Sequence, residues 1–510
     1  MDLIAKAKAG TLWMALQEVS FRVLSFGTNI ILARLLFPRD FGVVALALVA
    51  WEIIRLLGNL GIGAKLIHQQ DDIEGYATAA FWLNITLAII LAVLTAIIAP
   101  YIALFYSNDL IHHILLLYSA VYIIQSLGST HLALLNKALA FKKIALVELL
   151  ITFLSKSIAI TMAITGYGVW SLVIPEVILS PLKVLGLWII NPWRPSLALN
   201  ISYWRDIFVF GFNFLGADLV RYLNINGDYM IIGKLLGEHS LGLYTFAYNL
   251  ANLPFQAITA VAAKVAFPIL SGLQDNLERF REVFLKMTKV VSLVSFPLLI
   301  ELFIFSDLFV PLIYGNKWEA SILPLKIIIG FVLFRTFASP GGQILFAMGR
   351  PDILFKFNLG QVPFLLTAVF IGARYGIVGA AIGMSGVLMV GTLVLLYISL
   401  RPIGLSLRTP FQAIFPAAAS SGLTALSLGL LKGIFLTAGL QNYLILISLM
   451  PLGFVIYLIA LSLFFRDDFK FLRNLFWEEL IGRAITTFRS PDFASFPVGS
   501  ALLLRKTKKL

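Results

Sequence analysis

Seven cationic side chains lie inside segments that are otherwise apolar enough to cross a membrane. They are Arg22, Arg55, Lys156, Arg221, Lys264, Lys326 and Arg335. A Lys or Arg near the middle of a membrane-spanning helix costs roughly 2.5–3.5 kcal/mol even on the lenient insertion scale, so such residues persist where they are paired or line a water-filled path. An anionic cargo moving along that path would explain them.

Three of these cations have an acidic partner close by in the sequence. The pairs are Glu18 with Arg22, Glu52 with Arg55, and Asp218 with Arg221. A spacing of three or four residues puts the acid and the base on one face of a helix, where they neutralise each other. One interpretation of each pair is a buried ion pair that holds helices together, and the other is a polar path for cargo.

Clustered arginines suit a phosphate or pyrophosphate group, because the guanidinium fork binds it through two hydrogen bonds and stays charged. We therefore expect a substrate-binding set in which Lys264 leads toward the arginines and Arg335 is a further mid-span member. The set is Arg22, Arg55, Arg221, Lys264 and Arg335. The acids Glu18, Glu52 and Asp218 are expected to act as counter-charges or as proton sites for ion coupling.

The composition indicates which elements must carry these side chains. Hydrophobic residues make up 60% of the 510 residues, charged residues make up 13%, and the mean hydropathy is +0.93, values typical of a polytopic membrane protein. About fourteen apolar stretches are long enough to span a bilayer as helices, and runs this long and apolar exclude a closed barrel. We predict an all-α protein with spans at 11–33, 41–62, 77–99, 110–134, 144–165, 168–190, 207–233, 239–267, 287–312, 322–346, 353–373, 376–399, 409–431 and 441–465.

The distribution of Lys and Arg predicts the orientation in the membrane. With the N-terminus in the cytosol, 26 of the 39 basic residues fall in cytosolic loops and termini, 6 fall outside and 7 are the intramembrane set. The positive-inside rule therefore favours an even number of helices with both termini in the cytosol. The first segment carries Glu18 and Arg22 and is followed by no small-residue cleavage site, so we expect a retained helix and not a signal peptide.

A repeat at an offset of about 200 residues indicates a duplicated chain. Rare residue types coincide at this offset, as in Glu18 with Asp218, Gly27 with Gly227 and Gly42 with Gly242, and an offset of 208 aligns Tyr167-Gly168 with Tyr375-Gly376. Because the offset holds six spans, the halves should share an orientation and be related by an axis along the membrane normal. The predicted parts are an N-lobe of six helices (1–200), a C-lobe of six helices (201–405), helices 13 and 14 (406–465) and a cytosolic tail (466–510).

The tail is basic and amphipathic. Residues 466–510 hold nine basic and five acidic residues, and the apolar residues of 468–489 fall near one helical face, which is typical of a helix lying on the inner leaflet. A solvated tail is the alternative. Contact with anionic lipid accounts for the net charge of +13, so no nucleic-acid partner is expected.

Several classes of site are missing from the sequence. The absence of cysteine excludes disulfides and thiolate metal sites, the five histidines show no metal-ligand spacing, and no phosphate-binding loop of the Lys-Ser/Thr type is present. A membrane glycosyltransferase or polymerase would ordinarily need long loops, and the predicted outer loops are short. We therefore expect no catalytic residue, no cofactor and no metal, and any energy input would come from an ion gradient.

Several motifs resemble a known family. The stretch Ala33-Arg34-Leu35-Leu36-Phe37-Pro38-Arg39-Asp40-Phe41-Gly42 and the later stretches Leu60–Ile67, Gly166–Val173, Phe267–Asp275 and Ala347–Asp352 are similar to bacterial polysaccharide-export flippases of the Wzx type. These flippases belong to the multidrug/oligosaccharidyl-lipid/polysaccharide exporter superfamily. The similarity covers about residues 1–465.

The resemblance implies a two-lobed bundle of 12 to 14 helices that opens alternately to each side of the bacterial inner membrane. It implies a cargo of undecaprenyl-diphosphate-linked oligosaccharide, a cavity lined by the first and seventh helices, and partners in the export machinery such as a polysaccharide polymerase. Arg22 and Arg221 lie on those two helices. Multidrug antiporters and peptidoglycan-precursor flippases of the same superfamily are the alternatives.

Overall fold

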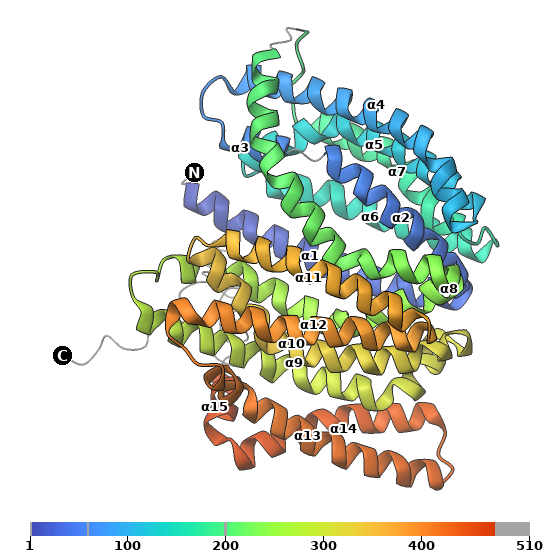
Figure 1. The fold of residues 1–510 in the computed structure, drawn as a ribbon, viewed down its shortest axis with the longest axis vertical. Helices are drawn as coiled ribbons and strands as arrows, with labels where there is room; N and C mark the ends of the chain where they lie inside the picture. The colour runs from blue at the N-terminus through green and yellow to red at the C-terminus, as the bar shows by residue number, and fades with distance from the viewer. Residues whose placement is uncertain (1–2, 59–60, 198–200, 475–510) are drawn as a thin grey trace. The chain divides into compact units, whose positions relative to one another are not determined.

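The computed structural model describes residues 3–58, 61–197 and 201–474, and these residues form helices joined by short connections. Figure 1 shows their order. The helices are α1 (Leu3–Leu35), α2 (Pro38–Gly58), α3 (Ile62–His68), α4 (Ile73–Tyr106), α5 (Asp109–Lys137), α6 (Phe141–Ile164), α7 (Trp170–Ile190), α8 (Ile201–Ser271), α9 (Leu277–Tyr314), α10 (Ile322–Ala347), α11 (Pro351–Ala373), α12 (Gly376–Leu400), α13 (Arg408–Thr437), α14 (Asn442–Phe464) and α15 (Arg466–Asn474), with the 3₁₀ turns η1 (Asn316–Ser321) and η2 (Arg401–Ile403). The predicted all-α class is confirmed.

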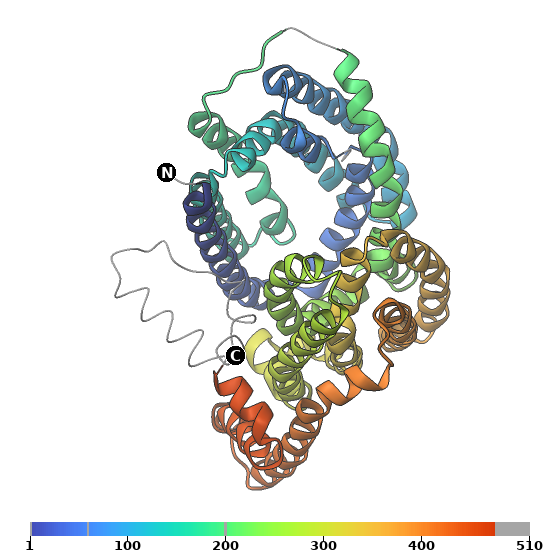
Figure 2. The same ribbon diagram turned by 90° about the vertical axis from the view of Figure 1, so that its left-hand side faces the viewer.

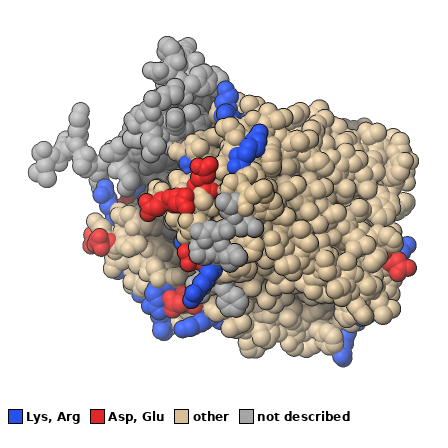
Figure 3. All heavy atoms as spheres, turned by 90° about the horizontal axis from the view of Figure 1, so that it is seen from above, with Lys and Arg blue, Asp and Glu red and all other residues tan. Residues whose placement is uncertain are grey.

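Many of these helices are long and apolar enough to cross a membrane. Within the described ranges ten meet that test, and a bent pair, Asn316–Thr336 with Gly341–Ala347, would make eleven. Broad surfaces free of charge agree with contact to lipid: on the face in Figure 3, Lys, Arg, Asp and Glu gather mostly along one side and leave a wide uncharged area. The total of fourteen crossings stays a prediction.

The chain forms two compact units, residues 1–245 and 246–510. In the first unit α4 packs along α5, α5 along α7, α7 along α6, and α6 along α1. In the second, α9 packs against α10 and α13, while α12 packs against both α10 and α11. Figure 2 turns the ribbon so that many of these helices are seen along their axes. The lobe limits at residues 200 and 405, which rest on the repeat, stay a prediction.

Helix α8 changes direction at Gly237, whose backbone (φ 78°, ψ 174°) is not helical. A positive φ of this kind is accessible to glycine and strained for other residues. The break falls between the predicted spans 207–233 and 239–267. It brings the chain after Gly237 back toward the start of α2.

At that point α2 and α8 approach each other at backbone distance. A Cβ atom added to Gly42 would lie 1.7 Å from the carbonyl oxygen of Glu238, and one added to Gly242 would lie 1.8 Å from the carbonyl oxygen of Pro38. Arg39 and Glu238 form an ion pair beside this contact, with 2.9 Å between Nε and Oε1. Only glycine allows so close an approach.

The repeat also appears in local backbone shape. Gly168 and Gly376, aligned at the offset of 208, both have a positive φ, of 53° and 79°, and each lies where a helix pair is joined. The same turn chemistry at matched positions is what a duplicated unit would retain.

The C-terminal segment is described as far as Asn474. The short helix α15 packs against α14, Leu472 is buried, and Asp468 forms an ion pair with Lys289 of α9. Residues 475–510, which include most of the predicted membrane-surface helix, lie outside the described part of the chain.

Candidate substrate-binding site

The Glu52–Arg55 pair lies on the last turns of α2. Arg55 donates from Nε and Nη2 to Glu52 Oε2 over 3.0 and 2.6 Å, and both side chains are about one-third to two-fifths exposed. A guanidinium carries five N–H donors, so this pair leaves three of them for another acceptor. The predicted pairing is confirmed, and Arg55 keeps the capacity to bind an anion.

The Asp218–Arg221 pair lies in the first half of α8. Arg221 donates from Nε and Nη2 to Asp218 Oδ1 over 3.3 and 3.1 Å, longer than the corresponding bonds of Arg55. The Arg221 side chain is 63% exposed. A loosely held and accessible guanidinium is suited to exchange its carboxylate for a ligand.

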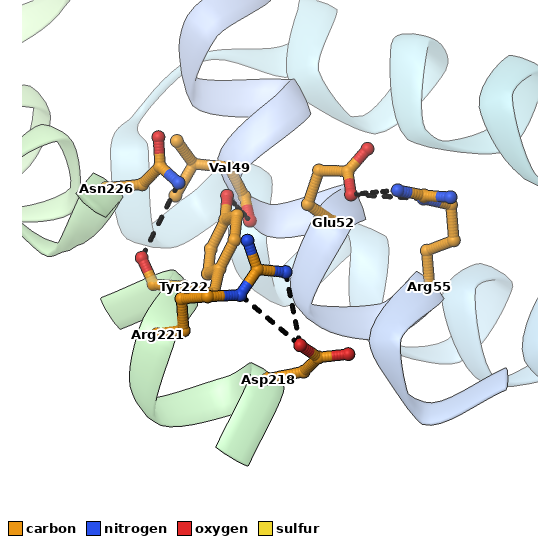
Figure 4. A network of polar contacts seen from close by, with 7 residues as sticks. All are labelled: Val49, Glu52, Arg55, Asp218, Arg221, Tyr222 and Asn226. Carbon is orange, nitrogen blue, oxygen red and sulfur yellow. Dashed lines mark hydrogen bonds and ion pairs between the residues drawn. The ribbon is translucent and has the colours of Figure 1, made fainter. Parts of the chain in front are cut away.

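One tyrosine joins the two helices that carry these pairs. The Tyr222 hydroxyl donates to the carbonyl oxygen of Val49, one turn before Glu52, over 3.1 Å. Figure 4 shows the result: the Tyr222 hydroxyl joins α2, which carries Glu52 and Arg55, to α8, which carries Asp218 and Arg221. Asn226 donates to the carbonyl oxygen of Tyr222. The structure therefore brings two of the three predicted pairs into one polar site.

Sequence reasoning missed Tyr222 as a member of this site. The sequence feature that could have identified it is a tyrosine directly after Arg221 in an apolar helix. The amide residues Asn224 and Asn226 follow it at alternate positions. Half-buried polar side chains of this kind hold a membrane helix against a neighbour through hydrogen bonds. Tyr222 thus joins the helix that carries one pair to the helix that carries the other.

The start of α8 is fixed by two crossed tyrosine–aspartate bonds to α4. The Tyr76 hydroxyl donates to Asp206 Oδ2 over 3.1 Å, the Tyr203 hydroxyl donates to Asp72 Oδ2, and the two rings stack with centroids 4.1 Å apart. The Tyr203 hydroxyl and the Gly75 amide hold the pKa of the Asp72 carboxyl below its usual value. This clamp anchors the helix that presents Asp218 and Arg221.

The third pair is formed as the spacing predicts. Arg22 Nη2 lies 2.6 Å from Glu18 Oε1, and Nε donates to the same oxygen over 2.8 Å. The pair lies on α1, which packs along α6. It is separate from the network that Tyr222 joins, so its place in the site stays a proposal.

The two remaining members of the predicted set lie in the second unit. Arg335 is half-buried on α10, with its guanidinium carbon 4.8 Å from the centroid of the Phe255 ring. This cation–π contact stabilises the charge without neutralising it. The side chain of Lys264 lies outside the described residues.

Comparison with known proteins establishes the family. The family model described as "Polysaccharide biosynthesis protein" matches residues 31–323, more than half of the chain and the region that holds both Arg55 and Arg221. The chain belongs to the polysaccharide biosynthesis protein family. The resemblance to polysaccharide exporters is confirmed.

Two known bacterial proteins resemble the chain over most of its length. The chain is 30% identical over 320 residues to the teichuronic acid biosynthesis protein TuaB of Bacillus subtilis (strain 168), covering 62% of this chain and 66% of that protein. It is 26% identical over 406 residues to the lipopolysaccharide biosynthesis protein WzxC of Escherichia coli (strain K12), covering 79% of this chain and 82% of that protein. The match to TuaB thus spans just under two thirds of that relative.

The fold of this polysaccharide biosynthesis family member is found in a solved membrane-protein structure. The structure of the lipid II flippase MurJ in an inward closed conformation superposes with a TM-score of 0.74 and 16% sequence identity, covering 90% of this chain and 99% of that one. At this identity the likeness shows a common fold.

Proposed function

We propose that this protein flips an undecaprenyl-diphosphate-linked oligosaccharide from the cytosolic to the outer face of the bacterial inner membrane. The observation that carries the proposal is the joined site of α2 and α8, where two arginines with unused donors lie within predicted membrane spans of a polysaccharide biosynthesis protein. Charged residues at that depth are retained where they meet a polar ligand or one another.

The diphosphate is the part of the cargo that the arginines bind. Arg55 and Arg221 each keep N–H donors that their carboxylates do not use, and a bidentate contact to phosphate oxygens is stronger than a neutral hydrogen bond. Arg22, Arg335 and Lys264 extend the cationic path in this proposal.

The acids keep the empty site neutral. Glu52 and Asp218 pair with the arginines when no cargo is bound, and they are released when phosphate takes the guanidinium groups. A released carboxylate can then take up a proton, so Glu18, Glu52 and Asp218 are the proposed points of coupling to an ion gradient.

A complementation experiment tests the proposal. The full chain is expressed in a bacterium that lacks its own exopolysaccharide flippase, and surface polymer is measured with the wild type and with Arg22→Ala, Arg55→Ala and Arg221→Ala at equal membrane levels. Arg374→Ala serves as the control, because Arg374 is exposed, contacts the Phe370 ring and belongs to none of these pairs. Polymer restored by the wild type and the control, and lost in the arginine variants, is the expected result.

Two results would overturn parts of the proposal. Full polymer in all three arginine variants would remove the arginines from the site. No polymer with the wild type would point to another cargo, which drug-efflux and peptidoglycan-precursor assays then distinguish.

A further inference from the structure

A cavity of about 200 Å³ lies inside the first unit, between α2, α3, α4 and α5. Arg55 of the α2 pair forms part of its lining, so the cavity adjoins the site described above. Helix α3 contributes only apolar residues and glycine, among them Ile62 and Leu66, whereas α4 and α5 contribute polar side chains. The cavity is therefore amphipathic.

Its polar lining contains hydrogen-bonding groups that are not used. The Thr130 hydroxyl is buried and has no partner. Within the described ranges no hydrogen bond reaches the Asn84 amide or the Tyr122 hydroxyl, although both line the cavity. Buried polar groups in native proteins are nearly always hydrogen-bonded, so the unmet Thr130 hydroxyl at the wall of this cavity indicates a polar occupant.

The charge of the lining favours a neutral occupant. Among the described lining residues Arg55 is the one charged group, and in the proposed function the diphosphate of the cargo binds it. Asn84, Tyr122 and Thr130 each offer both a donor and an acceptor, as the hydroxyl groups of a sugar do. A second anion would find no free positive charge here.

The volume of the cavity suits one small ring. At about 200 Å³ it is smaller than the ~300–1,000 Å³ typical of sites for drug-sized ligands. A pyranose has polar edges and two faces that carry C–H groups. The polar α4 and α5 lining and the apolar α3 lining match those two kinds of surface.

We propose that this cavity binds one neutral sugar ring, the residue attached directly to the diphosphate of the cargo. The inference rests on the proposed function, because it is Arg55 at the diphosphate that places the first sugar beside the opening. It assigns Asn84, Tyr122 and Thr130 to sugar recognition, and it makes this cavity a selector for the first residue of the oligosaccharide.

Two substitutions separate a sugar site from a simple packing defect. Thr130→Val replaces the unmet hydroxyl with a methyl group of the same shape, and Gly63→Leu extends into the cavity, where the nearest atom to a new Cβ is 3.8 Å away. If the cavity were only a defect, both changes would leave transport intact and would raise the unfolding temperature. A sugar site predicts the same or higher stability with transport reduced at least ten-fold.

The controls are matched by residue type. Thr95→Val alters a fully buried threonine whose hydroxyl donates to the Leu91 carbonyl, and Gly429→Leu alters a glycine with open space around it on α13. Both should transport as the wild type does. No transport with the wild type would contradict the proposed function, whereas wild-type transport in both cavity variants would overturn the sugar site alone.

A binding measurement identifies the occupant. The purified full chain is heated with methyl glycosides of neutral hexoses and N-acetylhexosamines, and separately with inorganic pyrophosphate. We expect at least one glycoside to raise the unfolding temperature of the wild type and of Thr95→Val but not of Gly63→Leu. The assignment would be overturned if pyrophosphate alone raised the unfolding temperature and Gly63→Leu abolished that effect. It would also be overturned if no glycoside raised the unfolding temperature up to its solubility limit.

Discussion

Gly42 and Gly242 occupy equivalent places in one reciprocal contact between α2 and α8. Gly42 faces the carbonyl oxygen of Glu238, and Gly242 faces the carbonyl oxygen of Pro38. Gly42 and Gly242 are 200 residues apart in the sequence, and so are Pro38 and Glu238. When two equivalent segments are related by a two-fold axis, every contact between them occurs twice with the roles exchanged. The two glycine contacts have this relationship, and they support the repeat found in the sequence.

This contact should open and close during transport, and a pair of cysteines will report it. Arg39 and Glu238 lie within ion-pair distance, and the natural chain contains no cysteine. We expect the double variant Arg39→Cys, Glu238→Cys to be cross-linked by a short, cleavable bifunctional reagent. The cross-linked protein should lose polymer export, and reduction of the reagent should restore it. Full export by the cross-linked protein would show that this contact need not open.

The glycines should control how well the same contact closes. In the cysteine-pair background, Gly42→Ala or Gly242→Ala places a methyl group less than 2 Å from a backbone carbonyl oxygen, so the helices must separate. The cross-linked fraction at a fixed reagent time should fall several-fold. Gly216→Ala, which has open space, is the control.

Arginine should be required at position 221 for its shape as well as its charge. Lysine supplies a point charge without the planar fork that binds two phosphate oxygens. We expect Arg221→Lys to lose about 10-fold or more in export rate, in line with the ~1.5–3 kcal/mol of a hydrogen bond to a charged group, and Arg221→Ala to lose more. Equal rates for Lys and Arg would indicate a general electrostatic role.

Removal of the Tyr222 hydroxyl should loosen the site without removing any charge. Tyr222→Phe loses the bond to the Val49 carbonyl, which is worth ~0.5–1.5 kcal/mol. Export should fall less than in Arg221→Ala, and the unfolding temperature of the purified protein should fall by about 1 °C. A normal export rate with unchanged stability would mean that α2 and α8 are held together by other contacts.

The Asp72–Tyr203 bond should give a defined pH dependence of stability. The folded protein holds the pKa of Asp72 below its ordinary value of 3.8. The stabilisation of the folded state by the ionised carboxylate is therefore fully present above pH 3.8, and it is lost as the pH falls through the lower pKa of the folded protein. Tyr203→Phe removes the largest cause of the shift. The difference in unfolding temperature between wild type and variant should therefore be constant from pH 5 to 7 and should shrink below pH 3.8.

Glu301 and Gly453 should be coupled through packing in the second unit. A Cβ at Gly453 of α14 would lie 2.6 Å from Glu301 Oε1 of α9, and the Glu301 side chain is buried. Gly453→Ala should lower the unfolding temperature, and Glu301→Ala should relieve part of that loss. A double-mutant cycle is expected to give an interaction of ~0.5–3 kcal/mol, whereas strict additivity would contradict the contact.

The sequence predicted the local features of this protein well, because they depend on short-range rules. Apolar runs located the helices, and the spacing of Glu52 and Arg55 predicted an ion pair that the structure contains. The matched glycines and charges indicated the repeat. These inferences need only helical geometry and the cost of charge in a membrane.

The tertiary relationships could not be predicted in this way. The distance between the α2 and α8 pairs depends on the bond from Tyr222 to Val49, and neither residue is charged or part of a recognisable motif. The cavity beside Arg55 lies where α2, α3, α4 and α5 meet. Features of this kind depend on how helices meet, which a hydropathy pattern does not specify.

The reciprocal glycine contact also bears on the origin of the chain. If the two halves arose by duplication, the surface around Gly42 and its counterpart around Gly242 were once the same patch on two identical molecules. A self-complementary patch of that kind makes a homodimer before any fusion of genes. The ancestor would then have been a half-length membrane protein that worked as a parallel pair, and fusion would have freed each half to acquire different residues beside an inherited interface.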